Sequence, residues 1–268
     1  MNERSCAMNE LILYAVAGGI ATITFNRPQV MNALDSETIV AFRAACERAE
    51  LDGAARVVVL RGAGPAFLAG GDVASFKENL PGFSGKVIAL AGELHRGILA
   101  LRRAPKPVIA SVHGAVAGAG MSIMMACDLI IAAEGTQFTM AYSRIATSPD
   151  GGASWFLPRL VGYQKAMEML LLSDAVDAAY LQAMGVINRV VAAGELEAAT
   201  KTLAQRLAAG PATAYAETKA LVNSSINQQL MKHLDAEAQA FSRCAAHADF
   251  AEGVTAFVEK RKAVFRAG

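Results

Sequence analysis

Residues 108–128, VIASVHGAVAGAGMSIMMACD, decide the fold that this sequence predicts. The stretch begins with β-branched residues that are typical of a buried strand, and it then enters a glycine-rich turn. From about Ala117 the residues are better helix formers, so the turn leads into a helix N-terminus. The first amides of a helix lack carbonyl partners, and the small residues Gly118, Ala119 and Gly120 let a ligand approach them closely. The stretch therefore predicts a site that binds an oxyanion.

A membrane span is the alternative interpretation, because residues 107–133 are almost uncharged and long enough to cross a bilayer. His113 and Asp128 interrupt this run, and glycine and alanine dominate its middle. Val108–Val112 and residues 129–132 have the pattern of separate strands on either side of a helix. We therefore expect a buried core segment and no association with a membrane.

Composition narrows the class of protein. The chain has 268 residues, 54% of them hydrophobic and 18% charged, which is enough for a sizeable core. The formal net charge is +1 and no basic block is present, so nucleic acid is not an expected partner. We expect small molecules or copies of the chain itself as partners.

The four cysteines, Cys6, Cys46, Cys127 and Cys244, do not have the spacing of metal ligands. They are interpreted as reduced thiols in a cytoplasmic protein. Residues 1–10 contain no long apolar region, so we expect no secretory signal.

Alternating strand and helix patterns predict an α/β fold with a parallel sheet covered on both faces. A hairpin of residues 11–16 and Ile20–Phe25 is followed by a helix over 37–51, capped by Asp35 or Ser36. Further elements are expected at residues 56–61 (strand), 86–103 (helix), 108–112 (strand), 129–132 (strand) and 186–191 (strand).

Gly210 and Pro211 are predicted to separate an α/β core, residues 1–210, from a C-terminal helical region, residues 211–268. The three helices expected there carry apolar faces that have no obvious place on a core already covered. Packing against a neighbouring subunit would bury those faces.

Six motifs occur in order along nearly the whole chain. They are NRPQVMNAL at 26–34, FLAGGD at 67–72, VHGAVAGAG at 112–120, CD at 127–128, SPDGG at 148–152 and EGVTAFVEKR at 252–261. Together they resemble the enoyl-CoA hydratase/isomerase, or crotonase, superfamily. The resemblance implies a crotonase (ClpP-like) spiral of ββα units with a C-terminal helical trimerisation region, assembled as a homotrimer or a dimer of trimers. It implies an acyl-CoA thioester as substrate and no separate cofactor, since coenzyme A is part of the substrate.

The same resemblance assigns the thioester oxygen to the backbone amides of Gly71 and Ala119. Negative charge develops on that oxygen when a thioester enolate forms, and fixed amide dipoles stabilise it. The alternative is that the two glycine-rich motifs are only tight turns.

Acid–base residues select the reaction. Hydratases of this superfamily use two glutamates around one water, and the matching positions here hold Ser122 and Tyr142. Neither replaces a carboxylate at neutral pH, so hydration is not expected. Asp150 matches a catalytic aspartate of several isomerase branches, including the phenylacetate-pathway isomerases. A single carboxylate suits a 1,3-proton shift, which predicts an enoyl-CoA isomerase.

Four alternatives stay open at this point. The chain could be an enoyl-CoA hydratase despite the missing glutamates. Asp150 could cap the helix that starts near Gly152. It could act as the nucleophile of an aryl-CoA dehalogenase, with His95 as the base. The chain could also be a non-catalytic protein that binds CoA thioesters.

Substrate contacts are implied at two loops and at the C-terminal helix. In the neighbouring subunit, that helix could reach the adenosine phosphate through Phe257 and Lys260, although Lys260 could equally be a solvated charge. A lysine common in the family is replaced by Ala74, and Lys77 could substitute for it. The full set of expected substrate contacts is Gln29, Val30, Ala33, Ala69, Asp72, Val73, Gly118, Tyr142, Phe257 and Lys260.

Overall fold

The structure is a computed structural model that describes residues 11–78, 80 and 82–266. Cys6 and the expectation about a secretory signal in residues 1–10 therefore lie outside the described residues.

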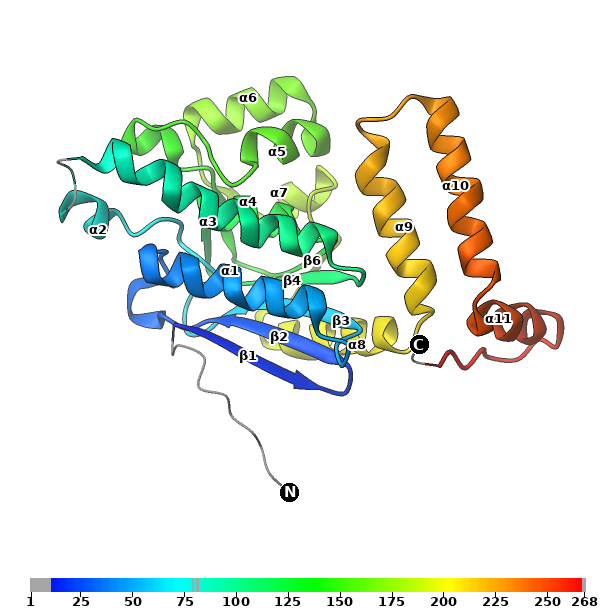
Figure 1. The fold of residues 1–268 in the computed structure, drawn as a ribbon. Helices are drawn as coiled ribbons and strands as arrows, with labels where there is room; N and C mark the ends of the chain where they lie inside the picture. The colour runs from blue at the N-terminus through cyan, green and yellow to red at the C-terminus, as the bar shows by residue number, and fades with distance from the viewer. Residues whose placement is uncertain (1–10, 79, 81, 267–268) are drawn as a thin grey trace.

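A six-stranded sheet forms the centre of the molecule (Figure 1). Its order is β1 (Ile12–Ala17), β2 (Ile20–Phe25), β3 (Val57–Gly62), β4 (Val108–Val112), β6 (Leu129–Ala133) and β9 (Arg189–Val191). β1 and β2 are the predicted antiparallel hairpin, and every later pair is parallel. Gly18 and Gly19 close the hairpin with φ of 58° and 77°, a conformation that favours glycine.

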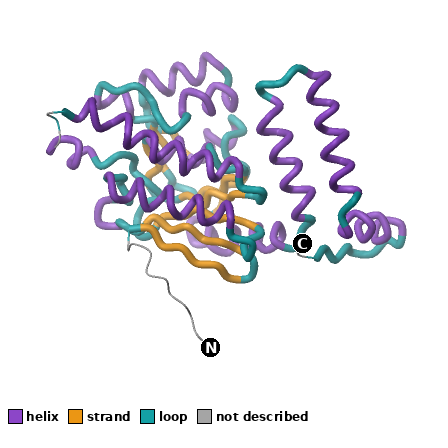
Figure 2. The backbone as a smooth tube through the Cα atoms, in the orientation of Figure 1, coloured by secondary structure: helices purple, strands orange, loops and turns teal. Residues whose placement is uncertain are grey.

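Helices cover both faces of this sheet, as the pattern predicted (Figures 1 and 2). α1 (Ser36–Leu51) and α3 (Phe83–Arg103) lie on one face, and α8 (Leu196–Ala208) packs on the other. Alternate residues of β3 divide between them: Val58 and Leu60 join the large core, whereas Val57 and Val59 pack with Ala204 of α8. The period of two in a strand therefore builds two apolar layers.

α1 begins where its cap was predicted. The Asp35 carboxylate accepts hydrogen bonds from the Thr38 amide at 2.8 Å and the Thr38 hydroxyl at 2.7 Å. The helix buries Phe42 and Cys46 on its apolar face, and the ring of Phe42 lies 5.4 Å from that of Phe25 in β2. This packing fixes the loop that connects β2 to α1.

A second, three-stranded sheet contains β5 (Ala115–Ala117), β7 (Gln137–Thr139) and β8 (Val176–Asp177). The predicted helix start near Ala117 therefore lies two residues before the observed one, and the strand β5 was not predicted. Val116 pairs with Phe138 of β7, so this part of the turn is a strand, and α4 (Ala119–Met125) begins only at Ala119.

The strand predicted over residues 186–191 is also shorter than expected. The amides of Val186 and Ile187 donate to the Leu181 carbonyl at 2.9 and 3.3 Å and close the end of α7 (Ala178–Ala183), so β9 starts only at Arg189. The remaining elements are η1 (Pro28–Val30), α2 (Val73–Glu78), η2 (Tyr142–Ile145), α5 (Ala153–Val161), α6 (Tyr163–Leu172) and η3 (Ala193–Glu195).

Three C-terminal helices, α9 (Ala212–Ser225), α10 (Leu230–Ala245) and α11 (Ala248–Val258), stand beside the core (Figure 1). The expectation that they have no place on the core was wrong for α9. Its Lys219 is inserted into the core surface, where Nζ lies 2.7 Å from Asp128 and donates to the carbonyls of Leu101 and Lys106. α10 and α11 retain exposed apolar side chains, which include Leu230, Met231, Leu234, Phe241, Phe257 and Val258.

No helix in the described part of the chain is both long and apolar enough to cross a membrane. The division at Gly210 and Pro211, which lie between α8 and α9, stays a prediction.

Candidate active site

Two glycine-rich segments run side by side at the start of α4. Leu68 forms a parallel bridge with Val116, and the Ala117 amide donates to the Leu68 carbonyl at 3.0 Å. Residues in a parallel pair advance together, so Gly71 follows Leu68 just as Ala119 follows Val116. The pairing brings the two predicted oxyanion positions into the same register.

Close backbone contact explains the glycines around them. A Cβ at Gly70 would lie 3.0 Å from the Ala117 carbonyl oxygen and 3.7 Å from the Ala119 nitrogen. A Cβ at Gly120 would lie only 2.2 Å from the Leu68 carbonyl oxygen. Side chains at these positions would force the segments apart.

The amides of Gly71 and Ala119 are unused donors. Within the described residues, neither donates a backbone hydrogen bond. Their neighbours do: the Gly118 amide donates to Thr139 at 3.0 Å, and the Asp72 amide donates to Leu34 at 2.9 Å. Because a partly buried N–H requires an acceptor, two aligned free amides are able to bind one oxygen of a ligand.

Arg27 ties the first predicted substrate loop to the second. Its guanidinium lies 3.0 Å from the Asp35 carboxylate and 3.2 Å from the Asp72 carboxylate, and it also donates to the Ala33 carbonyl. The Ala69 amide donates to Met31 at 3.0 Å. The structure thus brings together the segments that carry the predicted contacts Gln29, Val30, Ala33, Ala69, Asp72 and Val73. The Asp72 carboxylate is engaged by Arg27 in this arrangement.

Asn32 stabilises the inside of the same loop. It is fully buried with φ of 60°, a conformation that asparagine tolerates better than most residues. Its side-chain oxygen accepts from the Arg27 amide at 2.8 Å, and its nitrogen donates to the carbonyls of Ala63 and Ala66 at 2.9 and 2.7 Å. All of its polar atoms are satisfied, so the loop has one defined shape.

Asp150, Tyr142 and Ser122 form a hydrogen-bonded cluster that sequence reasoning missed. The Tyr142 hydroxyl donates to Asp150 Oδ1 at 2.8 Å and lies 2.9 Å from Ser122 Oγ. Ser122 Oγ also donates to the Asp150 carbonyl at 3.0 Å. Ser122 lies three residues after Ala119 on α4, so both are on one side of the helix, about 4.5 Å apart along its axis. The cluster therefore places the Asp150 carboxylate beside the helix that carries the Ala119 amide.

Tyr142 remains protonated in this environment. Burial, and then the nearby charge of Asp150, raise the pKa of the Tyr142 hydroxyl well above its usual value. It is consequently a neutral hydrogen-bond donor at physiological pH.

The interpretation of Asp150 as a helix cap was wrong. The residue that caps α5 is Gly152, and no side chain donates or accepts a cap hydrogen bond there. Gly151 and Gly152 have φ of 57° and 84°, so the chain turns sharply after Asp150 and directs its carboxylate to Tyr142.

Four predicted residues stay apart from this cluster. Phe257 is 85% exposed near the end of α11, and Lys260 follows that helix with φ of 55°, so it is not a helical residue as expected. α11 lies on the opposite side of the molecule from α2 (Figure 1). Lys77 is exposed on α2, and His95 is exposed on α3.

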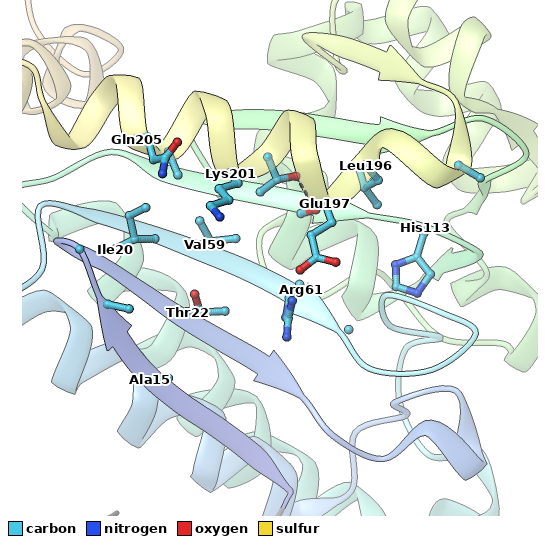
Figure 3. Close-up of a pocket in the computed structure, with 17 residues that line it drawn as sticks. Ala15, Ile20, Thr22, Val59, Arg61, His113, Leu196, Glu197, Lys201 and Gln205 are labelled. Carbon is cyan, nitrogen blue, oxygen red and sulfur yellow. Dashed lines mark hydrogen bonds between the residues drawn. The ribbon is translucent and has the colours of Figure 1, made fainter. Parts of the chain in front are cut away.

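A separate cavity of ≈ 590 Å³ lies between the main sheet and α8, on the sheet face that α8 covers (Figure 3). Arg61, His113, Glu197 and Lys201 line it, but none of the predicted site residues does. We place the chemistry at the paired amides, since that region combines amides that donate no backbone hydrogen bond among the described residues with a positioned carboxylate.

Metal ligands do not gather in the described part of the chain: no group of three His, Cys, Asp or Glu side chains is close enough to hold an ion. Cys46 and Cys127 are buried, and burial raises the pKa of each thiol. Both are therefore protonated core residues with little reactivity.

Comparisons with known proteins agree with this geometry. Residues 15–268 match the family model described as "Enoyl-CoA hydratase/isomerase". The chain belongs to this family. A protein of Rhodobacter capsulatus named "Probable enoyl-CoA hydratase" is 38% identical, over 93% of this chain and 95% of the relative. The 1,2-epoxyphenylacetyl-CoA isomerase of Escherichia coli is 33% identical, over 96% of this chain and 99% of the relative.

A crystal structure of an enoyl-CoA hydratase from a Polaromonas species superimposes with a TM-score of 0.91 at 35% identity. The match covers 95% of this chain and 99% of that one. The crotonase fold implied by the six motifs is thus confirmed. Relatives named hydratase and isomerase are both similar to the chain, so membership of the family leaves the reaction to be argued from the site.

Proposed function

We propose that this family member is an enoyl-CoA isomerase in which Asp150 carries a proton between C2 and C4 of the acyl chain. The observation that supports this best is the cluster in which Tyr142 and Ser122 hold Asp150 beside α4. The cluster offers one carboxylate, and the two amides of Gly71 and Ala119 are free to bind the thioester oxygen.

The proposed reaction needs only these groups. Ionised Asp150 removes a proton from C2 of a 3-enoyl-CoA, and the electron pair of that C–H bond spreads onto the thioester oxygen as a dienolate. The amides of Gly71 and Ala119 stabilise the charge on the oxygen. Protonated Asp150 then returns the proton to C4, so the double bond moves from C3–C4 to C2–C3 and the carboxylate is regenerated. No separate cofactor takes part in this scheme.

Water addition is disfavoured by the same two residues. Ser122 and Tyr142 occupy the positions where the hydratases are expected to carry glutamates, and here they are hydrogen-bonded to each other and to Asp150. A hydratase reaction stays the alternative because similar proteins carry that name. For an aryl-CoA dehalogenase, the exposed position of His95 on α3 offers little support for a base next to Asp150.

The localisation and the oligomeric state of the protein are part of the same proposal. A cytoplasmic homotrimer, or a dimer of trimers, would cover the exposed apolar side chains of α10 and α11. Phe257 and Lys260 would then contact the coenzyme A bound to a neighbouring subunit.

The test is the rate of conjugation of a 3-enoyl-CoA, followed by ultraviolet absorbance. We expect wild type to form the 2-enoyl-CoA, and Asp150→Asn to lose about 10²- to 10⁴-fold in kcat, as is typical for removal of a general acid–base group. Asp174→Asn removes an exposed carboxylate and should retain the wild-type rate.

Two outcomes would refute the proposal. One is an inert wild type, and the other is a fully active Asp150→Asn variant. Loss of absorbance from a 2-enoyl-CoA would identify a hydratase, and halide release from 4-chlorobenzoyl-CoA would identify a dehalogenase.

A further inference from the structure

In the cluster of Asp150, Tyr142 and Ser122, one hydrogen bond has a fixed direction. A carboxylate only accepts, and a phenol has a single O–H, so the Tyr142 proton is directed to Asp150 Oδ1. The single O–H of Ser122 lies within hydrogen-bond distance of two acceptors, the Tyr142 oxygen at 2.9 Å and the Asp150 carbonyl at 3.0 Å. Tyr142 therefore holds one oxygen of the carboxylate, and Ser122 contacts both Tyr142 and the Asp150 backbone.

The Tyr142 hydrogen bond distinguishes the two carboxylate oxygens of Asp150. Oδ1 is held by Tyr142, and no described residue forms a hydrogen bond with Oδ2. Oδ2 is therefore the oxygen that can receive a proton without breaking an existing hydrogen bond. Among the described residues, Tyr142 is also the one titratable side chain in hydrogen-bond contact with this carboxylate.

The backbone holds all three residues in place. Ser122 is fully buried on α4, and a Cβ at Gly151 would lie 2.9 Å from the Ser122 Cβ, so Gly151 allows the Asp150 loop to pack directly on that helix. Ala141, which precedes Tyr142, has φ of 53°, an uncommon conformation for alanine. Strained residues of this kind persist where the surrounding structure fixes them, and they concentrate at functional sites.

We infer that Tyr142 and Ser122 are positioning residues that hold Asp150 Oδ1 and leave Oδ2 to carry the proton between C2 and C4. The inference rests on the proposed isomerase function. Ser122 and Tyr142, which stand where the hydratases have glutamates, would then orient the carboxylate of Asp150, the one carboxylate that the proposed reaction uses.

The experiment compares kcat and KM of Tyr142→Phe, Ser122→Ala, the double variant and Asp150→Asn on a 3-enoyl-CoA. Tyr142→Phe keeps the ring and removes only the hydroxyl. We expect its kcat to fall by about 10- to 100-fold because the carboxylate is no longer aimed, and we expect little change in KM. Tyr163→Phe, at an exposed tyrosine of α6, is the matched control and should behave as wild type.

The split between kcat and KM separates positioning from a merely structural role. A disrupted substrate site should raise KM, whereas loss of positioning should lower kcat and leave KM nearly unchanged. Ser122→Ala should lower kcat less than Tyr142→Phe does, and the double variant should lose less than the product of the two single losses.

The outcomes distinguish this inference from the function on which it rests. If Asp150→Asn is inactive but Tyr142→Phe and Ser122→Ala keep the wild-type kcat, only the positioning role is wrong. A Tyr142→Phe variant with raised KM and unchanged kcat also overturns it. An inert wild type or an active Asp150→Asn variant overturns both statements.

Discussion

At the scale of single residues, the site depends on positions where even one methyl group is too large. Gly120 is the sharpest case, because its missing side chain lets α4 contact the Leu68 carbonyl. That carbonyl also accepts a hydrogen bond from the Ala117 amide. If the Leu68 backbone moved to make room for a side chain at position 120, the pairing that aligns Gly71 with Ala119 would be lost.

We predict that Gly120→Ala lowers the free energy of unfolding by about 1–3 kcal/mol, the usual range for overpacking. It should also reduce activity strongly, since it moves the Ala119 amide. Gly92→Ala is the control: it lies on α3 with nothing within 4 Å of its Cβ, so it should stabilise the protein by about 0.4–1 kcal/mol. Urea denaturation of both variants measures the difference, and equal midpoints would contradict the prediction.

At the scale of elements, Arg27 connects the loop before α1 with the segment before α2. It contacts Asp35, which caps α1, and Asp72, which immediately precedes α2. The side chains of Arg27 and Asp72 are 14% and 15% exposed, so this network is only weakly screened by solvent.

Arg27→Met should therefore leave two carboxylates without their partner. We predict a loss of about 2 kcal/mol in unfolding free energy, less than the 3–5 kcal/mol of a fully buried pair. The KM for the acyl-CoA should rise, because the predicted substrate loops lose their connection. Arg206→Met, at an exposed position on α8, is the control, and a KM in Arg27→Met that equals wild type would show that the network does not shape the substrate site.

At the scale of the whole molecule, Lys219 attaches the C-terminal helices to the core. Its side chain is 8% exposed and lies 2.7 Å from Asp128, whose carboxylate also accepts from the amide of Val108 at 2.8 Å. The ion pair of Lys219 and Asp128 thus joins the predicted helical region to the predicted core. Asp128 and Val108, which it also binds, are the two ends of the stretch that decides the fold.

Lys219→Met removes one partner of this pair, and we predict a loss of about 3 kcal/mol in unfolding free energy. Adding Asp128→Asn should recover part of that loss, since the amide oxygen can still accept from Val108 and the carboxylate that lost Lys219 is no longer charged. Lys232→Met on the exposed surface of α10 should have little effect. A Lys219→Met protein with the wild-type urea midpoint would mean that α9 is held to the core by other contacts.

Much of this molecule could be predicted from sequence where the signal is local. The hairpin, the Asp35 cap and the strand Val108–Val112 follow from periodicity and cap chemistry, and the six motifs predicted the fold. Contacts between distant segments could not be predicted in this way. β5 has three residues and depends on pairing with β7, and the Lys219–Asp128 pair joins positions far apart in the chain.

The candidate site shows the same limit. Ser122 and Tyr142 were recognised only as replacements for glutamates, because a pattern of residue types contains no information on which side chains meet. Their hydrogen bonds to Asp150 depend on the packing of α4, η2 and the loop before α5. The proposed amide positions could be predicted from motifs, whereas the group that aims the carboxylate could not.

The most direct test of the central claim is product analysis by NMR after wild-type protein is incubated with a 3-enoyl-CoA, beside Asp150→Asn under the same conditions. The proposed function predicts that wild type converts the substrate to the 2-enoyl-CoA without addition of water, and that Asp150→Asn leaves the substrate unchanged. Accumulation of a 3-hydroxyacyl-CoA, or equal conversion by the two proteins, would contradict it.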